Sequence, residues 1–173
     1  MGSAFSQKKI LDCIKEYLDT TDFNKKQIVI KKQLDLPDFN RPIKYKSYDE
    51  ANRNKLATIS NESNEYDLSK INVVMFVWSI ASAIDNVFDY REYIDKQEEY
   101  KIISKVIVLF ILFHEFVHVR QVKQGMTVEN YRNNKETYEC EADKKAYKFI
   151  TSFGEKERKI IDKFLENRSP SVF

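Results

Sequence analysis

The segment from about Asp95 to Gln124 limits the possible folds more than any other part of the sequence. Its residues read as one long helix, and Gly125 stands where a C-terminal cap is expected. Between Val106 and Val119 the segment is apolar on every side of a helix, except at a short polar motif. Because a helix that is apolar all round is a buried one, we expect this helix at the centre of the molecule.

The other segments are predicted to be helices and a few short strands. Only three glycines occur, and none lies between Gly2 and Gly125, so glycine-dependent hairpins are unavailable for most of the chain. Amphipathic spacing predicts further helices over residues 4–19, from about 129 or 136 to 153, and over 155–167. β-Branched or alternating residues predict strands over 27–34, 43–48 and 56–60.

Residues 67–90 fit either of two structures. Ile71–Trp78 is a continuous apolar run that could be a buried strand, and the apolar residues from Ala81 to Phe88 have helical spacing. Periodicity does not separate a buried strand from a buried helix in such a run, and we favour helix through most of it.

These elements predict an α+β fold of one domain, residues 1–173, in which helices dominate and a small three-stranded sheet packs on the central helix. The N-terminal helix and the strands are expected within residues 1–65, and a helical region that holds the functional site within 66–173.

The polar motif in the central helix is His114-Glu115-Phe116-Val117-His118, and its histidines are the only two in the chain. This is the H-E-x-x-H pattern of zinc peptidases. Residues i and i+4 share one face of a helix, so both imidazoles can bind one metal. Glu115 lies about 100° round the helix, where it can act as a catalytic base without binding the metal.

A catalytic zinc usually has three protein ligands, and with no third histidine the remaining one must be a carboxylate or a thiolate. On the helix that follows Gly125, Glu139 falls near the centre of the apolar face, whereas Glu141 points toward solvent and Cys140 lies well off the face. A carboxylate on an apolar face needs a partner, which zinc would supply. The alternative is that Glu139 is a surface residue favoured near a helix start by the helix dipole.

Asp143 lies at the edge of the same face, four residues after Glu139. We predict that it accepts a hydrogen bond from the free ring nitrogen of His114 or His118. The sequence therefore predicts metal ligands His114, His118 and Glu139, with Glu115 as the base and Asp143 behind the ligands.

The motif His114-Glu115-x-x-His118 followed by Glu139-x-x-Ala142-Asp143-x-x-Ala146 resembles the compact gluzincin metallopeptidases, above all the ImmA/IrrE-type family of bacteria, mobile elements and phages. The resemblance covers roughly residues 110–150. It implies a zincin-like core, one Zn²⁺ per chain, Glu139 as the third ligand, and hydrolysis of peptide bonds. Family members typically cleave a repressor or other regulatory protein in the cytoplasm, so a protein substrate such as a DNA-binding regulator is expected.

The remaining composition favours a cytoplasmic protein. The net charge is +2 with both signs interspersed, which argues against direct binding of nucleic acid. Cys13 and Cys140 lie too far apart in sequence to suggest a disulfide framework. The first residues lack the apolar core of a signal peptide, and the longest apolar stretch, Val106–Phe113, is far short of the roughly 20 residues of a membrane span.

Two other functions are compatible with parts of the pattern. One is a zinc-stabilised interaction module without catalysis, against which Glu115 argues; the other is a helical interaction protein in which the motif is accidental, against which the face of Glu139 and Asp143 argues. A peptidase usually also has a second electrophile, which here must be a Tyr, Arg or Lys. Tyr131, Tyr138 and Tyr147 are near the motif in sequence, and the choice among them stays open.

Overall fold

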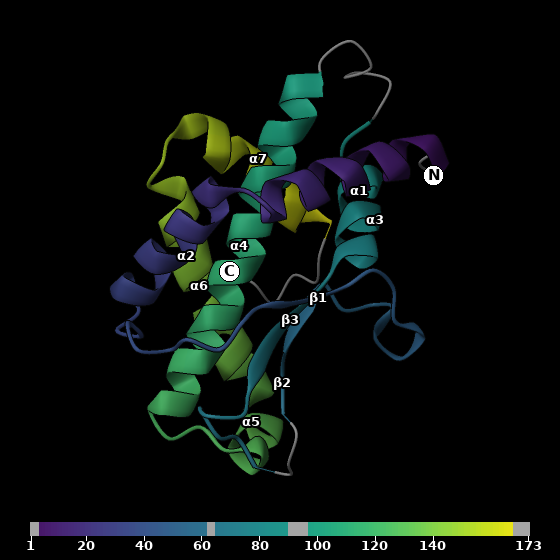
Figure 1. Ribbon diagram of the computed structural model, residues 1–173. Coiled ribbons are helices and arrows are strands. Elements are labelled where there is room, and N and C mark those ends of the chain that lie inside the picture. The colour runs from purple at the N-terminus through teal and green to yellow at the C-terminus, as the bar shows by residue number, and fades with distance from the viewer. Residues whose placement is uncertain (1–3, 62–64, 90–96, 168–173) are drawn as a thin grey trace.

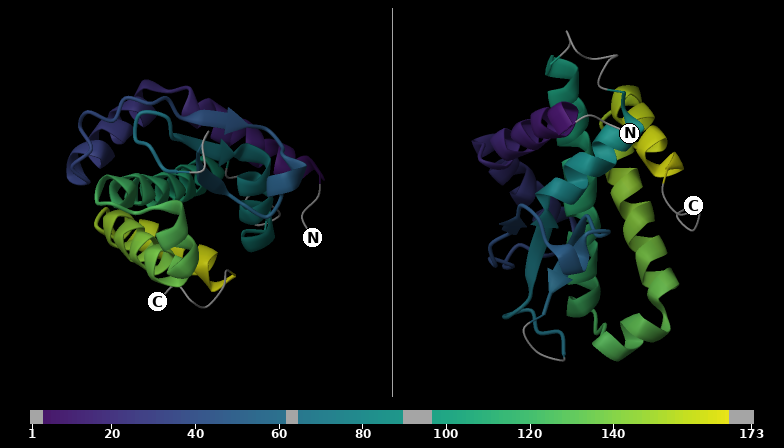
Figure 2. Two further views of the ribbon diagram at one scale, coloured as in Figure 1. Left: turned by 90° about the horizontal axis from the view of Figure 1, so that it is seen from below. Right: turned by 90° about the vertical axis from the view of Figure 1, so that its right-hand side faces the viewer.

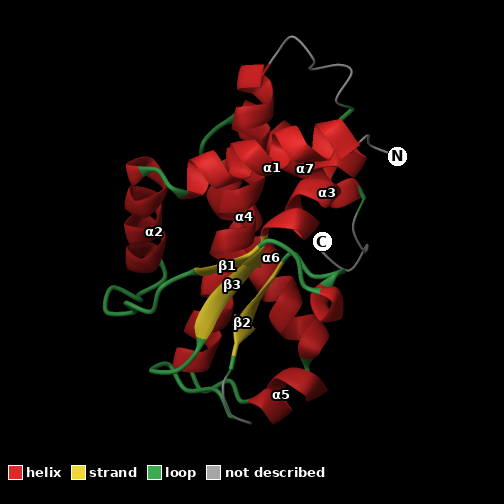
Figure 3. Cartoon of the chain, turned by 45° about the vertical axis from the view of Figure 1, so that its right-hand side comes forward, coloured by secondary structure: helices red, strands yellow, loops and turns green. Residues whose placement is uncertain are grey.

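The computed structural model describes residues 4–61, 65–89 and 97–167. The elements follow in the order α1 (Ala4–Leu18), α2 (Thr21–Gln33), β1 (Lys44–Lys46), the 3₁₀ turn η1 (Glu50–Asn52), β2 (Ala57–Ser60), β3 (Asn72–Phe76), α3 (Val77–Val87), α4 (Gln97–Lys123), α5 (Val128–Asn133), α6 (Lys135–Thr151) and α7 (Glu155–Glu166). Helices dominate and a three-stranded mixed sheet accompanies them (Figures 1 and 3), which confirms the predicted α+β class.

Helix α4 is the centre of the fold, as its apolar sequence predicts. It packs against β2 on one side and against α6 and α7 on the other, while α1 covers another face (Figure 2). Gly125 ends it with a φ of +105°, and the amide of Met126 donates to the carbonyl of Gln121 at 2.9 Å. Within the described residues α4 alone has the length and apolarity to cross a membrane, but 89% of its most apolar window is buried inside the fold. The core accounts for its apolarity.

The sheet has the order β1-β3-β2, with β3 in the middle. β1 pairs with β3 in parallel, and β2 pairs with it antiparallel, with Thr58 opposite Val74. All five residues of β3 are buried, and the strand is flanked by β1 and β2 on its two edges. β2 is therefore an edge strand beside α4, and this places one sheet edge next to the histidine motif.

The predicted strand over residues 27–34 is wrong, because this segment belongs to helix α2. Thr20 caps the helix, and its hydroxyl accepts a hydrogen bond from the amide of Phe23 at 3.2 Å. Phe23 and Ile30 are buried against the core, whereas Ile28 is 66% exposed and does not alternate inward as a strand residue would. Capping and burial at helical spacing override the β-branched composition.

The capping bond of α2 gives a direct test of this local structure. Thr20→Ala removes the acceptor for the amide of Phe23 and is expected to lower the free energy of unfolding by about 1 kcal/mol. Urea denaturation followed by circular dichroism measures this change. Thr21→Ala, one residue further along, keeps the cap and should leave the midpoint nearly unchanged; equal losses in both variants would contradict the capping role.

The preference for helix through most of residues 67–90 is wrong for its first half, where Asn72–Phe76 forms β3, and residue 90 lies outside the described residues. The helix over the following apolar residues is confirmed as α3, which begins directly at Val77. β3 lies within residues 66–173, the part of the chain expected to be helical, whereas β1 and β2 lie within residues 1–65. The sheet therefore joins strands from both parts. The remaining predicted elements are confirmed, and the helix that carries Glu139 begins at Lys135, the later of the two proposed starts.

Candidate metal centre

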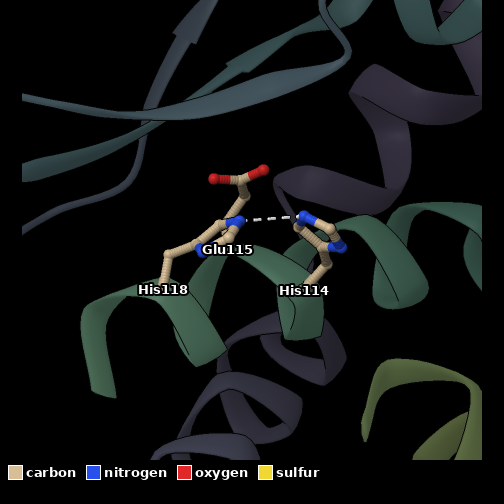
Figure 4. A group of neighbouring side chains, drawn as sticks. All are labelled: His114, Glu115 and His118. Atoms are coloured by element: carbon tan, nitrogen blue, oxygen red, sulfur yellow. Dashed lines mark hydrogen bonds between the residues drawn. The ribbon is translucent and has the colours of Figure 1, made fainter. Parts of the chain in front are cut away.

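The histidine motif lies on the side of α4 that faces β2 and α6. His114, Glu115 and His118 are all buried, and one potential ligand atom from each lies within 4.8 Å of the others. Figure 4 shows the two imidazole rings turned toward each other, with the Glu115 carboxylate directed toward the strands above them. This buried group could bind a metal ion.

Helix α6 brings Glu139 to the same point. Ala142 and Ala146 are fully buried in its contact with α4, and their small side chains allow the two helices to approach closely. The Glu139 carboxylate places Oε2 3.1 Å from Nε2 of His114 and Oε1 3.3 Å from Nε2 of His118. The two Nε2 atoms are 3.0 Å apart.

These separations are close to those of ligands around one small metal ion. Atoms that bind zinc tetrahedrally at about 2.0–2.2 Å lie about 3.3–3.5 Å from one another. The two histidines of α4 and Glu139 of α6 therefore converge with separations close to those of ligands around one tetrahedral metal ion.

The Nδ1 atoms of both imidazoles point away from this convergence and have partners of their own. Asp143 accepts a hydrogen bond from Nδ1 of His114 at 2.8 Å. The prediction offers His114 or His118 as its partner, and in the structure the partner is His114. Oε1 of Gln121 lies 2.8 Å from Nδ1 of His118. Gln121 is absent from the sequence prediction, although its position three residues after His118 on a buried helix face indicates a contact.

Glu141 differs from its predicted orientation toward solvent. Its side chain is partly exposed, but its carboxylate accepts a hydrogen bond from Nε2 of Gln121 at 2.9 Å. Hydrogen bonds from Gln121 and Lys145 lower the pKa of Glu141 against the opposing effect of burial. Glu141 therefore supports the site from behind His118 and does not contact the converging ligand atoms.

The convergence of acceptor atoms changes the proton affinities of the site. Burial alone would lower the pKa of His114, but hydrogen bonds with Asp143 and Glu139 and the charge of Glu115 raise it to about 10. Burial would raise the pKa of Glu139, yet its contacts with both histidines hold it far below the ordinary value. Without a metal, the site therefore retains a proton among Nε2 atoms and carboxylate oxygens that otherwise repel one another.

A binding metal must displace this proton, which gives a pH prediction. Since the pKa of His114 is about 10, metal affinity is expected to rise about tenfold per pH unit from pH 6.5 toward 10 if one proton is released. Competition with a chelator of known affinity between pH 6.5 and 8.5 measures the slope. An affinity that does not depend on pH would contradict the retained proton.

The free energy of unfolding of the metal-free protein should fall as the pH rises, whereas the metal affinity should increase. The pKa of His114 is higher in the folded chain than its ordinary 6.5, so the bound proton stabilises the fold fully below pH 6.5, and this stabilisation is lost as the pH rises through about 10.

Of the three tyrosines near the motif in sequence, Tyr131 is the one whose hydroxyl contacts a predicted metal ligand. It donates a hydrogen bond to Oε1 of Glu139 at 2.5 Å, and its ring meets that of His118 edge-on. Burial and the Glu139 carboxylate raise the pKa of Tyr131. The hydroxyl of Tyr147 instead donates to Asp162 on α7, and Tyr138 stacks on Tyr131.

A cleft of about 770 Å³ opens over the site. β2 forms one wall with Ala57–Ile59, and α4 forms the floor with Glu115 and both histidines. Tyr131, Tyr66 and Phe164 of α7 also line the cleft. The motif is thus buried within the fold and still borders a space large enough for a segment of peptide.

Comparison of the chain with known protein families, with curated proteins and with solved structures found no significant match.

Proposed function

We propose that this protein is a zinc-dependent peptidase with a zincin-like core, in which His114, His118 and Glu139 bind one Zn²⁺ per chain. The convergence of the two Nε2 atoms and the Glu139 carboxylate within 3.0–3.3 Å carries the proposal. Both Nδ1 atoms already face acceptors, so the Nε2 atoms and the carboxylate meet one another and need a positive charge between them, which is a proton in the metal-free protein and would be the metal ion when it binds.

The donor set favours zinc among the common metals. Two imidazoles and one carboxylate in a near-tetrahedral arrangement with one remaining position form a typical catalytic zinc site, whereas calcium and magnesium prefer all-oxygen sites with more ligands. When bound, zinc would act as a Lewis acid on the scissile carbonyl and make water acidic enough to attack it near neutral pH.

The surrounding side chains have separate roles in this proposal. Glu115 borders the cleft, where its carboxylate takes the proton of the attacking water and later delivers it to the leaving amine. Asp143 holds the proton of His114 on Nδ1 and keeps Nε2 available to the metal. The single hydroxyl hydrogen of Tyr131 is donated to Glu139 in this structure, and in the proposed mechanism it turns to the carbonyl oxygen of the bound substrate, where it would stabilise negative charge.

The cleft fits an extended peptide as the substrate. β2 is one of the two edge strands and lines the cleft, so a peptide backbone laid along it could pair with the strand while its scissile bond lies over the motif. From the family resemblance we propose a regulatory or repressor protein in the cytoplasm as the physiological substrate.

Metal analysis and a cleavage assay test the proposal together. Purified protein is expected to hold about one zinc per chain, and to cleave members of a proteome-derived peptide library, as detected by mass spectrometry. Chelation should abolish cleavage and added zinc should restore it. Protein with no affinity for zinc would refute the proposal, and zinc without any cleavage would favour an interaction module that zinc stabilises.

Tyr131→Phe separates the hydroxyl from the ring. The variant keeps the packing against His118 but loses the donor beside Glu139, so kcat is expected to fall about 10²-fold while zinc content is retained. Tyr147→Phe is the matched control, because its hydroxyl bonds to Asp162 outside the cleft lining. Equal kcat in wild type and Tyr131→Phe would remove Tyr131 from the proposed mechanism.

A further inference from the structure

We infer that Gln121 is a positioning residue that fixes the ring proton of His118 and ties that ligand to the helix that carries Glu139. The inference rests on the proposed function, since it treats His118 and Glu139 as metal ligands. Gln121 is only 3% exposed and lies in the last turn of α4, three residues after His118. Its side-chain amide contacts three groups at once.

The orientation of this amide follows from its partners. One end lies 3.1 Å from the carbonyl oxygen of Tyr138 and 2.9 Å from Oε2 of Glu141. A backbone carbonyl can only accept, and an ionised carboxylate likewise, so the NH₂ group of Gln121 must face both and its two hydrogens are used. The amide oxygen is then the atom that lies 2.8 Å from Nδ1 of His118.

This orientation determines which nitrogen of His118 carries the proton. An amide oxygen accepts and cannot donate, so Nδ1 of His118 must hold the hydrogen of this bond. The lone pair of the neutral ring is therefore on Nε2, which points at His114 and Glu139. Gln121 thus does for His118 what Asp143 does for His114, but with a neutral acceptor.

The same amide also holds the neighbouring helix. Its two acceptors, Tyr138 and Glu141, belong to α6 and lie on either side of Glu139 in sequence. Together with the bond between His114 and Asp143, this ties α4 to α6 at two levels, and Glu139 lies between them. Loss of the Gln121 amide is therefore expected to disturb two ligands, one from each helix.

Imidazole N–H signals give a readout that a general loss of stability would not mimic. Because the chain has only two histidines, the zinc-loaded protein should show two slowly exchanging ring N–H protons in ¹H–¹⁵N spectra. Gln121→Leu should lose the signal of His118 and retain that of His114, whereas Asp143→Ala should do the reverse. Loss of both signals or of neither in Gln121→Leu would overturn the inference.

Zinc affinity gives the second readout, measured by chelator competition. Gln121→Leu is expected to weaken zinc binding about 10–100-fold. Gln124→Leu, at an exposed position directly after the end of the same helix, should bind zinc as the wild type does. Gln121→Glu should also weaken binding, because its carboxylate faces Glu141. Adding Glu141→Gln to that variant returns a donor to the pair and should recover most of the loss.

The outcomes separate this inference from the proposed function. Wild-type protein that binds no zinc overturns both. Wild-type protein that binds zinc, with unchanged affinity in Gln121→Leu, overturns the role of Gln121 alone. If Gln121→Leu does not fold, the Gln121→Glu variant with and without Glu141→Gln decides the question, and an absence of recovery in the double variant counts against the inference.

Discussion

Glu115→Gln is expected to retain about one zinc per chain and to lose peptide hydrolysis by about 10²–10⁴-fold. The substitution keeps the shape of the side chain but removes the carboxylate that accepts a proton. Glu115 is adjacent to His114 in the chain and borders the cleft, and the carboxylates of Glu139 and Asp143 contact the imidazoles as a ligand and a supporting acceptor would. Single-turnover cleavage of one identified peptide measures the loss.

Two controls make this result specific to the base. Glu98→Gln is the same substitution at an exposed position in the first turn of α4, and it should cleave as the wild type does. Zinc content and the melting temperature of Glu115→Gln should match those of the wild type. Full activity in Glu115→Gln would show that another group takes the proton and would remove the main argument for catalysis over a zinc-stabilised interaction module.

The parts of the fold that follow from sequence are those in which one physical signal dominates. The central helix is apolar all round and ends at a glycine, and α4 forms with this end. Around Ile71–Trp78 an apolar run could be either strand or helix, and pairing with β1 and β2, a long-range effect, decides for β3. In α2 the β-branched run favours a strand, and the cap at Thr20, about two turns earlier, decides against it.

The candidate site likewise has one part that follows from local sequence and another part that depends on how the helices pack. Helical spacing places Glu139 and Asp143 on one face of α6, and this much is local. The distances of 3.1 and 2.8 Å from these carboxylates to His114 depend on how α6 packs on α4, which only the fold supplies. Tyr131 was one of several tyrosines in sequence; α5 and the break at Asn134 bring its hydroxyl to Glu139.

Glu139→Ala is expected to lose metal, in contrast to Glu115→Gln. It removes one of three proposed ligands and leaves the two Nε2 atoms to bind zinc alone, so affinity should fall by more than the roughly 100-fold that loss of a supporting residue can cost. Equilibrium competition with a chelator measures the affinity. Glu136→Ala, an exposed glutamate in the first turn of the same helix, is the matched control and should bind zinc normally.

The metal-free form of Glu139→Ala sharpens the test. In the wild type the Glu139 carboxylate contacts both imidazoles and helps to raise the pKa of His114 to about 10. Its removal should bring that pKa closer to 6.5, so the proton that competes with the metal is held less tightly, which by itself would favour binding. A large loss of affinity in spite of weaker proton competition can therefore only come from the lost bond to the metal. Unchanged affinity would mean that Glu139 is not a metal ligand and that the third ligand is another group.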